Sequence, residues 1–354
     1  MESPITIHPD ISESERPWVE LQPEFEQLGY RFRPRFRQGW KPSWDEDGPA
    51  GRFCGAEDAV MLDYRSVIDA FRLRDKARVV IKMLPANHEG GQNELQITRY
   101  LGNPAGGGHT ATVPLLDTLV LPSRPDLIFM VLPELVRWNT RRFARVDEAL
   151  NFVRQLLHGL LFMHENSVAH GDIGAGNIMM DGLHYFEDEP HPAQLSKRLD
   201  FTAPTRLRHY TPLFPKYYFI DFGRAVYNPP GYRLFVAPEY GQDWSVPEIA
   251  DANVEKVDPF KVDLWSMGRF LSLYLVNSYI GLDMLLPIVQ GFMQVDPNAR
   301  MTASDAVDLF ESILSRLSDI ELSSELLRND SYSVSSVLFE ERYGEVLRAV
   351  DNMT

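Results

Sequence analysis

Apolar residues between positions 67 and 135 fall into short runs, a pattern typical of strands with one helix among them. Two strand-like runs flank the polar turn Arg74-Asp-Lys76, so together they predict a hairpin. The next segment spaces its apolar residues like a helix and ends in a glycine-rich stretch. Two further apolar runs follow. In chain order these elements are expected at residues 67–73, 77–84, 93–101, 113–121 and 127–132.

From Val146 onwards the spacing becomes helical. Residues 146–164 repeat apolar residues every three or four positions, which predicts an amphipathic helix. Because strands precede helices, the chain is expected to be α+β, with a small sheet-rich lobe and a larger helical lobe. Further helices are expected at 262–279, 281–292 and 302–317; the expected divisions are a leading segment at 1–50, the lobes at 51–135 and 136–320, and an extension at 321–354.

The first 50 residues are punctuated by prolines, which indicates an extended or partly ordered segment. Within it, residues 31–37 read Arg-Phe-Arg-Pro-Arg-Phe-Arg. In an extended chain this alternation places the four arginines on one face and Phe32, Pro34 and Phe36 on the other. The segment either lies on the protein body with its charges solvated or docks an acidic partner.

Charge and composition narrow the class of protein. The chain has 35 Lys and Arg against 50 Asp and Glu, a net charge of −15, which argues against nucleic acid or an anionic membrane as the main partner. Its one cysteine, Cys54, excludes an intrachain disulfide. Neither a secretory signal nor an apolar run long enough to span a membrane is visible. We therefore expect an intracellular protein, cytoplasmic or nuclear.

Oxygen-bearing side chains suited to phosphate chemistry occur in two places. The segment His170-Gly-Asp-Ile-Gly-Ala-Gly-Asn177 must be a loop, in which Asp172 and Asn177 can face one site. A carboxylate there can accept a hydroxyl proton, and an amide oxygen can ligate a hard cation. The apolar strand Tyr218-Phe-Ile delivers Asp221 at a turn. Asn177 and Asp221 are therefore candidate Mg²⁺ ligands beside substrate phosphates.

A lysine lies upstream of these acids. Lys82 ends a Val-Val-Ile run, which makes it the natural phosphate contact. Glu94 follows 12 positions later and can hold that lysine by an ion pair.

Together these residues resemble the protein kinase superfamily over residues 67–310. Seven short motifs occur in the family's order, and their joint occurrence carries the resemblance. The catalytic loop, the long insert after it and Tyr-Phe-Ile-Asp-Phe-Gly are also similar to kinase-like proteins of mushroom-forming fungi. The motifs are Val80-Ile-Lys82, Asn93-Glu-Leu-Gln-Ile97, His170-Gly-Asp172 through Asn177, Asp221-Phe-Gly223, Ala237-Pro-Glu239, Asp263-Leu-Trp-Ser-Met-Gly268 and Asp296-Pro-Asn-Ala-Arg300.

The resemblance implies a bilobal protein-kinase-like fold with ATP and Mg²⁺ as cofactors. By this resemblance Asp172 is the catalytic base, and Asn177 and Asp221 bind Mg²⁺. Lys82, which Glu94 holds in place, binds the phosphates of the nucleotide. His170 is architectural, and Glu239 forms a buried ion pair with Arg300. The residues that would meet adenine are the gatekeeper Leu132, followed by Pro133, Glu134 and Leu135.

The sequence differs from the protein kinase pattern in three places that concern phosphate binding, regulation and substrate specificity. No Gly-x-Gly-x-x-Gly precedes Lys82, so the loop that covers the ATP phosphates is unconventional or poor. Gly171 stands where protein kinases carry an arginine after the catalytic-loop histidine. The predicted activation segment, residues 221–239, contains no serine or threonine. Both absences predict a protein that is not switched by activation-loop Ser/Thr phosphorylation. Gly174 and Tyr232 stand where Ser/Thr kinases carry a lysine and a threonine, which puts that specificity in doubt.

The fourth departure is a long insert. Asn177 and Asp221 are 44 positions apart, where the family has a short hairpin, and the insert at 182–216 lies beside the predicted site. The stretch between Asn177 and Asp221 holds three histidines without close metal spacing, and five basic and five acidic residues.

Three functions stay open at this stage. The leading one is a protein kinase that moves the γ-phosphoryl group of ATP to a protein hydroxyl with Mg²⁺. An inactive pseudokinase that serves as a binding scaffold is the second, and a small-molecule kinase is the third. The partners implied are ATP and an unidentified protein substrate or partner, with neither nucleic acid nor membrane.

Overall fold

The computed structural model describes residues 10–44, 56–61, 64–102, 108–208, 213–229, 231–232, 234–238 and 243–335. The chain divides into two compact units. The first comprises residues 1–141 and 179–223, and the second comprises residues 142–178 and 224–354. The boundaries expected at 50, 135 and 320 stay predictions.

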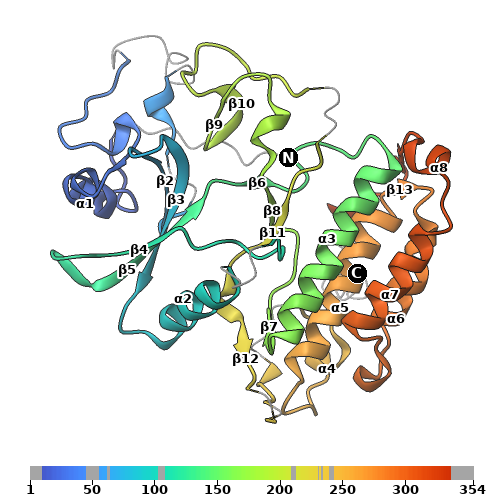
Figure 1. The fold of residues 1–354 in the computed structure, drawn as a ribbon. Helices are drawn as coiled ribbons and strands as arrows, with labels where there is room; N and C mark the ends of the chain where they lie inside the picture. The colour runs from blue at the N-terminus through green and yellow to red at the C-terminus, as the bar shows by residue number, and fades with distance from the viewer. Residues whose placement is uncertain are drawn as a thin grey trace, which may run out of the picture. The chain divides into compact units, whose positions relative to one another are not determined.

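The first unit is built on a five-stranded antiparallel sheet with the order β1-β2-β3-β5-β4 (Figure 1). The predicted hairpin is confirmed, and Lys76 turns it with a φ of 58°. The predicted helix is also confirmed and begins earlier, at Glu89. The elements are β1 (Tyr30–Arg31), β2 (Val67–Arg72), β3 (Ala77–Pro85), α2 (Glu89–Gly102), β4 (Asp117–Leu121) and β5 (Arg124–Pro133).

A helix in the leading segment corrects the expectation of an extended chain. Helix α1 (Arg16–Gln27) places Trp18, Leu21 and Phe25 on one face, at the spacing of an amphipathic helix. These side chains are buried in one cluster with sheet residues that include Ile81 and Phe129, so α1 covers one face of the sheet (Figure 1). Burying three large apolar side chains outweighs the proline punctuation.

Two arginines of the alternating segment are also buried, contrary to the interpretation with solvated charges. Arg35 is fully buried and donates two hydrogen bonds to the carboxylate of Glu15, which is itself fully buried. Arg33 forms a similar pair with Asp69 of β2 at 2.9 Å. Because a buried charge needs a partner, these pairs hold the segment on the sheet.

Short strands complete the first unit. Strands β6 (Val136–Arg137), β8 (Ile178–Met180) and β11 (Tyr217–Phe219) form a sheet in the order β11-β8-β6. The insert between β8 and β11 carries the hairpin β9 (Pro190–His191) and β10 (Gln194–Arg198). Contacts group the whole insert with the first unit.

The second unit is mainly helical, as expected. Helix α3 packs against α7, and α5 packs against α6. A capping box between Thr302 and Asp305 begins α7, and Asp258 caps α5 ahead of its first-turn proline. The elements are α3 (Val146–Glu165), β7 (Val168–Ala169), β12 (Val226–Tyr227), α4 (Pro247–Ala250), α5 (Pro259–Leu271), β13 (Tyr279–Ile280), α6 (Leu286–Phe292), α7 (Ala303–Leu314), α8 (Asp319–Ser323) and β14 (Leu327–Arg328).

The predicted ion pair of Arg300 has a different partner. Both ends of the Arg300 guanidinium bind Glu248 of α4, at 2.7 and 2.5 Å, and the pair is buried. Glu239, the partner expected from the motif, lies outside the described residues. The sequence Val246-Pro-Glu248 therefore takes the role that the kinase motif predicts for Ala237-Pro-Glu239.

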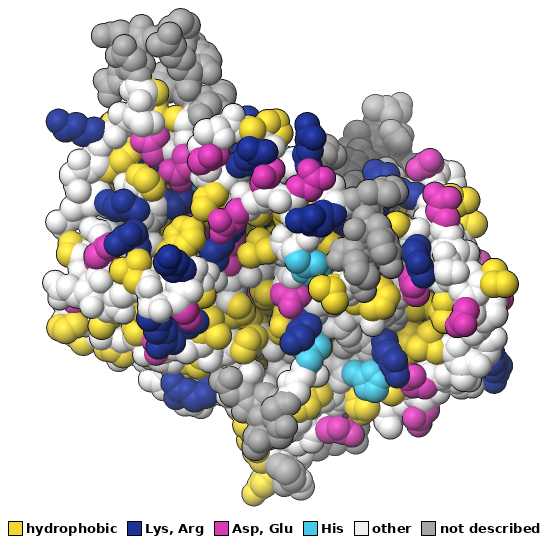
Figure 2. All heavy atoms as spheres, turned by 45° about the horizontal axis from the view of Figure 1, so that its top comes forward, with side chains coloured by type: hydrophobic (Ala, Val, Ile, Leu, Met, Phe, Trp, Pro, Cys, Tyr) yellow, Lys and Arg dark blue, Asp and Glu magenta, His cyan; other side chains and the backbone are white. Residues whose placement is uncertain are grey.

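The described surface mixes charges of both signs. On the face drawn in Figure 2, acidic and basic side chains are interspersed with polar and apolar ones. Among the described helices, none is long and apolar enough to cross a membrane.

Candidate functional site

Three of the residues predicted from the sequence meet in the first unit. Lys82 of β3 donates from Nζ to Glu94 Oε1 of α2 at 2.5 Å and to Asp221 Oδ1, just after β11, at 2.9 Å. The Lys82 and Glu94 side chains are largely buried, whereas Asp221 is about half exposed. The lysine is thus fixed by a buried acid and faces an accessible one, which suits a group that orients phosphates.

Burial and charge act on this trio in opposite directions. Burial lowers the pKa of Lys82, but the carboxylates of Glu94 and Asp221 outweigh it and raise the pKa above its usual value. Burial raises the pKa of Glu94, and Lys82 only partly offsets that effect. The ammonium therefore remains charged at neutral pH, as phosphate binding requires.

Backbone geometry adds to the placement of Asp221. Its φ is 64°, a left-handed conformation that costs a non-glycine residue energy and is common at functional sites. Gly223 donates from its backbone N–H to Asp221 Oδ1 at 3.4 Å. A Cβ at Gly223 would lie 3.2 Å from that oxygen and 3.4 Å from Glu94 Oε2, so glycine lets the turn approach both acids.

The second unit holds the other predicted pair. Asn177 donates from Nδ2 to the Asp172 carboxylate and to the Asp172 carbonyl oxygen, both at 2.9 Å. The amide nitrogen is therefore turned toward Asp172, which leaves Asn177 Oδ1 to act as a cation ligand. A carboxylate oriented in this way can accept a proton from a substrate hydroxyl.

A buried aspartate holds the backbone of this loop. Asp263 of α5 is 1% exposed and accepts hydrogen bonds from the backbone N–H groups of His170 at 2.7 Å and Gly171 at 2.9 Å. His170 is fully buried, and its Nδ1 accepts from the Asp172 N–H at 3.3 Å. This agrees with the architectural role expected for His170. Gly171 adopts a φ of 75°, a left-handed conformation that glycine adopts without steric cost.

Substituting this glycine should destabilise the second unit. We expect Gly171→Ala to lower the free energy of unfolding by about 1–2 kcal/mol, because alanine must adopt left-handed backbone. Gly174 is the matched control, since it lies in the same loop without a positive φ and with open space around its Cβ position. Urea unfolding of both variants measures the difference; equal midpoints would show that the conformation at residue 171 relaxes freely.

The residues predicted to meet adenine lie on or after β5. Leu132 pairs with Val80 of β3 and Pro133 pairs with Val79, so Leu132 shares the face of the sheet that carries Lys82. Leu135 is partly buried. Their contact with a nucleotide base stays a prediction.

Glu134 is already engaged by a side chain of β3. Its carboxylate accepts two hydrogen bonds from Arg78, one of them at 2.6 Å. Burial raises the pKa of Glu134 to about 7, although Arg78 opposes that shift. Sequence reasoning missed this pair, because Arg78 shows no motif.

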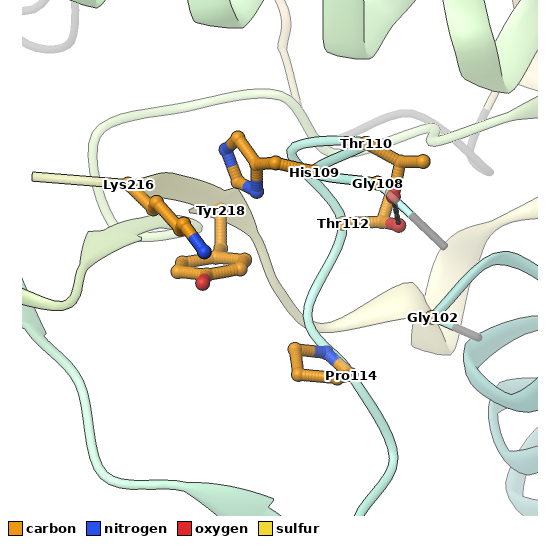
Figure 3. A pocket seen from close by; sticks show the side chains of 8 residues that line it. All are labelled: Gly102, Gly108, His109, Thr110, Thr112, Pro114, Lys216 and Tyr218. Atoms are coloured by element: carbon orange, nitrogen blue, oxygen red, sulfur yellow. Dashed lines mark hydrogen bonds between the residues drawn. The ribbon is translucent and has the colours of Figure 1, made fainter. Parts of the chain in front are cut away.

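A separate cavity of about 390 Å³ lies elsewhere in the first unit (Figure 3). Two threonine hydroxyls on its wall satisfy one another, since Thr110 and Thr112 are 2.8 Å apart and Thr112 donates to the Leu101 carbonyl. No residue predicted from the sequence to act in catalysis lines it. The lining residues are Gly102, Gly108, His109, Thr110, Thr112, Pro114, Lys216 and Tyr218.

Each unit presents an oxygen donor of the kind that Mg²⁺ binds beside substrate phosphates. In the first unit Asp221 presents an accessible carboxylate, and in the second unit Asn177 presents an amide oxygen. That both bind the same cation stays a prediction. Within the described part of the chain, no cluster of three His, Cys, Asp or Glu could hold a metal by itself.

No model of a known protein family matches the chain. Curated protein kinases do match it. The chain is 25% identical over 238 residues to the probable serine/threonine-protein kinase clkA of Dictyostelium discoideum, a match that covers 62% of this chain and 24% of that protein. It is 26% identical over 192 residues to the serine/threonine-protein kinase pim-2 of Danio rerio, a match that covers 49% of this chain and 56% of that protein.

A third match is to a kinase subunit. The chain is 23% identical over 266 residues to the phosphorylase b kinase gamma catalytic chain, liver/testis isoform, of Rattus norvegicus, with 65% of this chain and 56% of that protein covered. The matches thus span between a quarter and just over half of the relatives' lengths. They confirm the relationship to the protein kinase superfamily that the motifs predict, and the α+β fold agrees with it.

Proposed function

From this relationship to the protein kinases, we propose that the chain transfers the γ-phosphoryl group of ATP to a protein hydroxyl with Mg²⁺. The observation that carries the proposal is the contact of Lys82 with both Glu94 and Asp221. A lysine fixed between two acids, one of them accessible, has little structural purpose at the edge of a core. It is well suited to receive a polyphosphate and a cation.

Each residue has a distinct task in the transfer. Lys82 binds phosphate oxygens, and Glu94 keeps its ammonium in place. Asp221 would hold Mg²⁺, which would offset the negative charge of the phosphates, and Asn177 is the second ligand that the kinase resemblance implies. Asp172 accepts the proton of the attacking hydroxyl as that oxygen bonds to the γ-phosphorus and the bond to the β-phosphate oxygen breaks.

A thermal shift with MgATP tests the nucleotide site. At a concentration of about 100 times the dissociation constant, MgATP should stabilise the wild-type protein by about 2.7 kcal/mol. Asp221→Asn should lose most of this stabilisation, because the variant removes a charged cation ligand. The shift should also depend on Mg²⁺. No shift in the wild type at millimolar MgATP, together with no shift after the insert is shortened as described below, would contradict the proposal.

An inactive scaffold remains the second candidate because of one feature. The connection from β1 to β2 occupies residues 32–66 instead of a short glycine-rich loop. Buried ion pairs of Arg33 and Arg35 tie part of it to the sheet and to α1. A scaffold would show no phosphate transfer that depends on Asp172.

A further inference from the structure

The face of the sheet that carries Lys82 extends well beyond that lysine. Along β3, Val79 and Ile81 point into the core beneath α1, so Arg78, Val80 and Lys82 share the opposite face. Lys82 and Arg78 are four residues apart, which is about 13 Å along a strand. That length matches the reach of a nucleotide from its terminal phosphates to its base. We call this surface the nucleotide face.

Neighbouring strands continue the nucleotide face. Asp69 of β2 is the register partner of Val80, and Leu132 of β5 is the partner of Val80 on the other side. Two positions after Leu132, just beyond the end of β5, Glu134 reaches Arg78. The nucleotide face therefore has a phosphate end at Lys82 and a second end at Arg78 and Glu134, which is the end expected to receive the base.

The insert lies on that second end. Arg78, besides its pair with Glu134, donates from Nη1 to the carbonyl oxygen of Pro190 in β9 at 2.7 Å. Its Nη1 also lies 3.5 Å from the Glu189 carboxylate of the insert. The Arg78 and Glu134 side chains are only 7% and 6% exposed. If this end of the nucleotide face were open, the Arg78 and Glu134 side chains would be exposed to water. They are buried, and the contacts of Arg78 with Glu189 and Pro190 indicate that the insert covers them.

A second anchor joins the insert to the segment before β2. His191 of β9 is fully buried, and its Nε2 lies 3.1 Å from the Glu57 carboxylate. Glu57 also accepts from Arg33 at 3.2 Å, and Arg33 pairs with Asp69 on the nucleotide face. The chain of contacts His191–Glu57–Arg33–Asp69 thus connects β9 to the sheet.

In this closed arrangement, some buried polar groups lack hydrogen-bond partners. Among the described residues, Arg33 Nη2 and His191 Nδ1 are buried without a hydrogen-bond partner. Buried polar groups without partners favour a state in which water can reach them. The contacts of Pro190 with Arg78 and of His191 with Glu57 are hydrogen bonds, so water can replace them when the strand leaves. Such an interface is suited to opening.

We propose that residues 182–208, through β9, form an intramolecular cap that closes the base end of the nucleotide face and must release β9 before ATP binds fully. The inference rests on the proposed function. A closed cap reduces the apparent affinity for nucleotide by the fraction of molecules that are open. A partner that binds the insert would then switch the site without any phosphorylation of the activation segment.

The ends of the insert allow it to be removed cleanly. Asp181 and Lys216 are already paired, with the Asp181 N–H donating to the Lys216 carbonyl at 3.0 Å. Replacing residues 182–215 with Asn-Gly, a two-residue hairpin turn, should therefore preserve β8 and β11. A milder variant is His191→Ala, which removes the contact with Glu57. The matched control is Asp188→Ala, because the partner of Asp188 among the described residues is Arg198, which is exposed and lies inside the insert.

Isothermal titration with MgATP tests the cap on the full chain and these variants. We expect the Asn-Gly variant to bind at least about tenfold more tightly than wild type, His191→Ala a few-fold more tightly, and Asp188→Ala equally, since each open fraction scales the affinity. Equal dissociation constants in all four proteins would overturn the cap and leave the proposed function standing. Weaker binding by the Asn-Gly variant would also overturn it, because the insert would then be part of the binding site.

Hydrogen exchange provides a readout that does not rely on affinity. The amides of residues 189 and 191, which flank Pro190, should exchange faster in His191→Ala than in Asp188→Ala, and faster in the wild type when MgATP is saturating. Unchanged exchange under saturating MgATP would contradict release of β9. Absence of MgATP binding in all four folded proteins would instead remove the proposed function itself.

Discussion

Phosphate transfer should fall by about 10²–10⁴-fold in Asp172→Asn, while stabilisation by MgATP is retained. The substitution removes the base and leaves the shape of the loop. Asn177 donates to Asp172 Oδ2 at 2.9 Å, and the side-chain oxygen of an asparagine can accept that same hydrogen bond. The variant therefore separates chemistry from folding and from nucleotide binding.

The measurement is incorporation of radioactive phosphate from γ-labelled ATP into the chain itself and into casein as a general protein substrate. Asp283→Asn is the control, because Asp283 is exposed in the same unit and makes an equivalent change of charge. Transfer that persists in Asp172→Asn would remove the proposed base. Transfer that is absent from the wild type and from the variant with the shortened insert would favour the scaffold. ADP release that requires an added metabolite would favour the small-molecule kinase.

Local patterns predicted much of the fold and the site. Helices α2, α3 and α7 and the β2–β3 hairpin were expected close to their observed bounds, because periodicity and turn residues are local properties. Lys82, Glu94 and Asp221 were recognised from short motifs, and the structure brings them together. Asp172 and Asn177 form the second pair. The roles of these residues stay predictions.

The leading segment could not be predicted in the same way. Pro23 lies inside α1, and a proline there argues against a helix, although the spacing of Trp18, Leu21 and Phe25 was a usable signal. The burial of Arg35 depends on Glu15, which is 20 positions earlier in the chain. Charge alternation alone indicates a solvated face. Only the packing of α1 on the sheet shows that the arginine is enclosed.

The sequence motif predicted the wrong partner for Arg300. Ala237-Pro-Glu239 matches the family's tripeptide letter by letter, whereas Val246-Pro-Glu248 does not. The contact with Arg300 selects the second, and a segment that ends at Glu248 includes Ser245. The expectation of a segment without serine therefore loses its basis. Ser245 donates to Asp243 at 2.6 Å and accepts from Trp265 at 3.1 Å, so its hydroxyl has a structural role.

Glu248→Gln should lower the free energy of unfolding by about 3–5 kcal/mol, because it leaves Arg300 buried beside a neutral group. Arg300 is held by more than this carboxylate. It donates to the backbone carbonyls of Gln294 at 2.9 Å and Lys261 at 2.7 Å, and its guanidinium lies over the Trp265 ring. The guanidinium therefore cannot move into solvent without breaking these contacts, and the loss of the carboxylate is not relieved.

Two further variants test whether the loss of stability is specific to the Glu248–Arg300 pair. Glu311→Gln disrupts an exposed pair with Arg154 in the same unit and should cost no more than about 1 kcal/mol. Glu239→Gln tests the carboxylate that the motif had suggested. Urea unfolding should show a large decrease in midpoint for Glu248→Gln only. A large decrease for Glu239→Gln instead would return the pair to the motif's assignment, and with it the shorter activation segment that lacks serine.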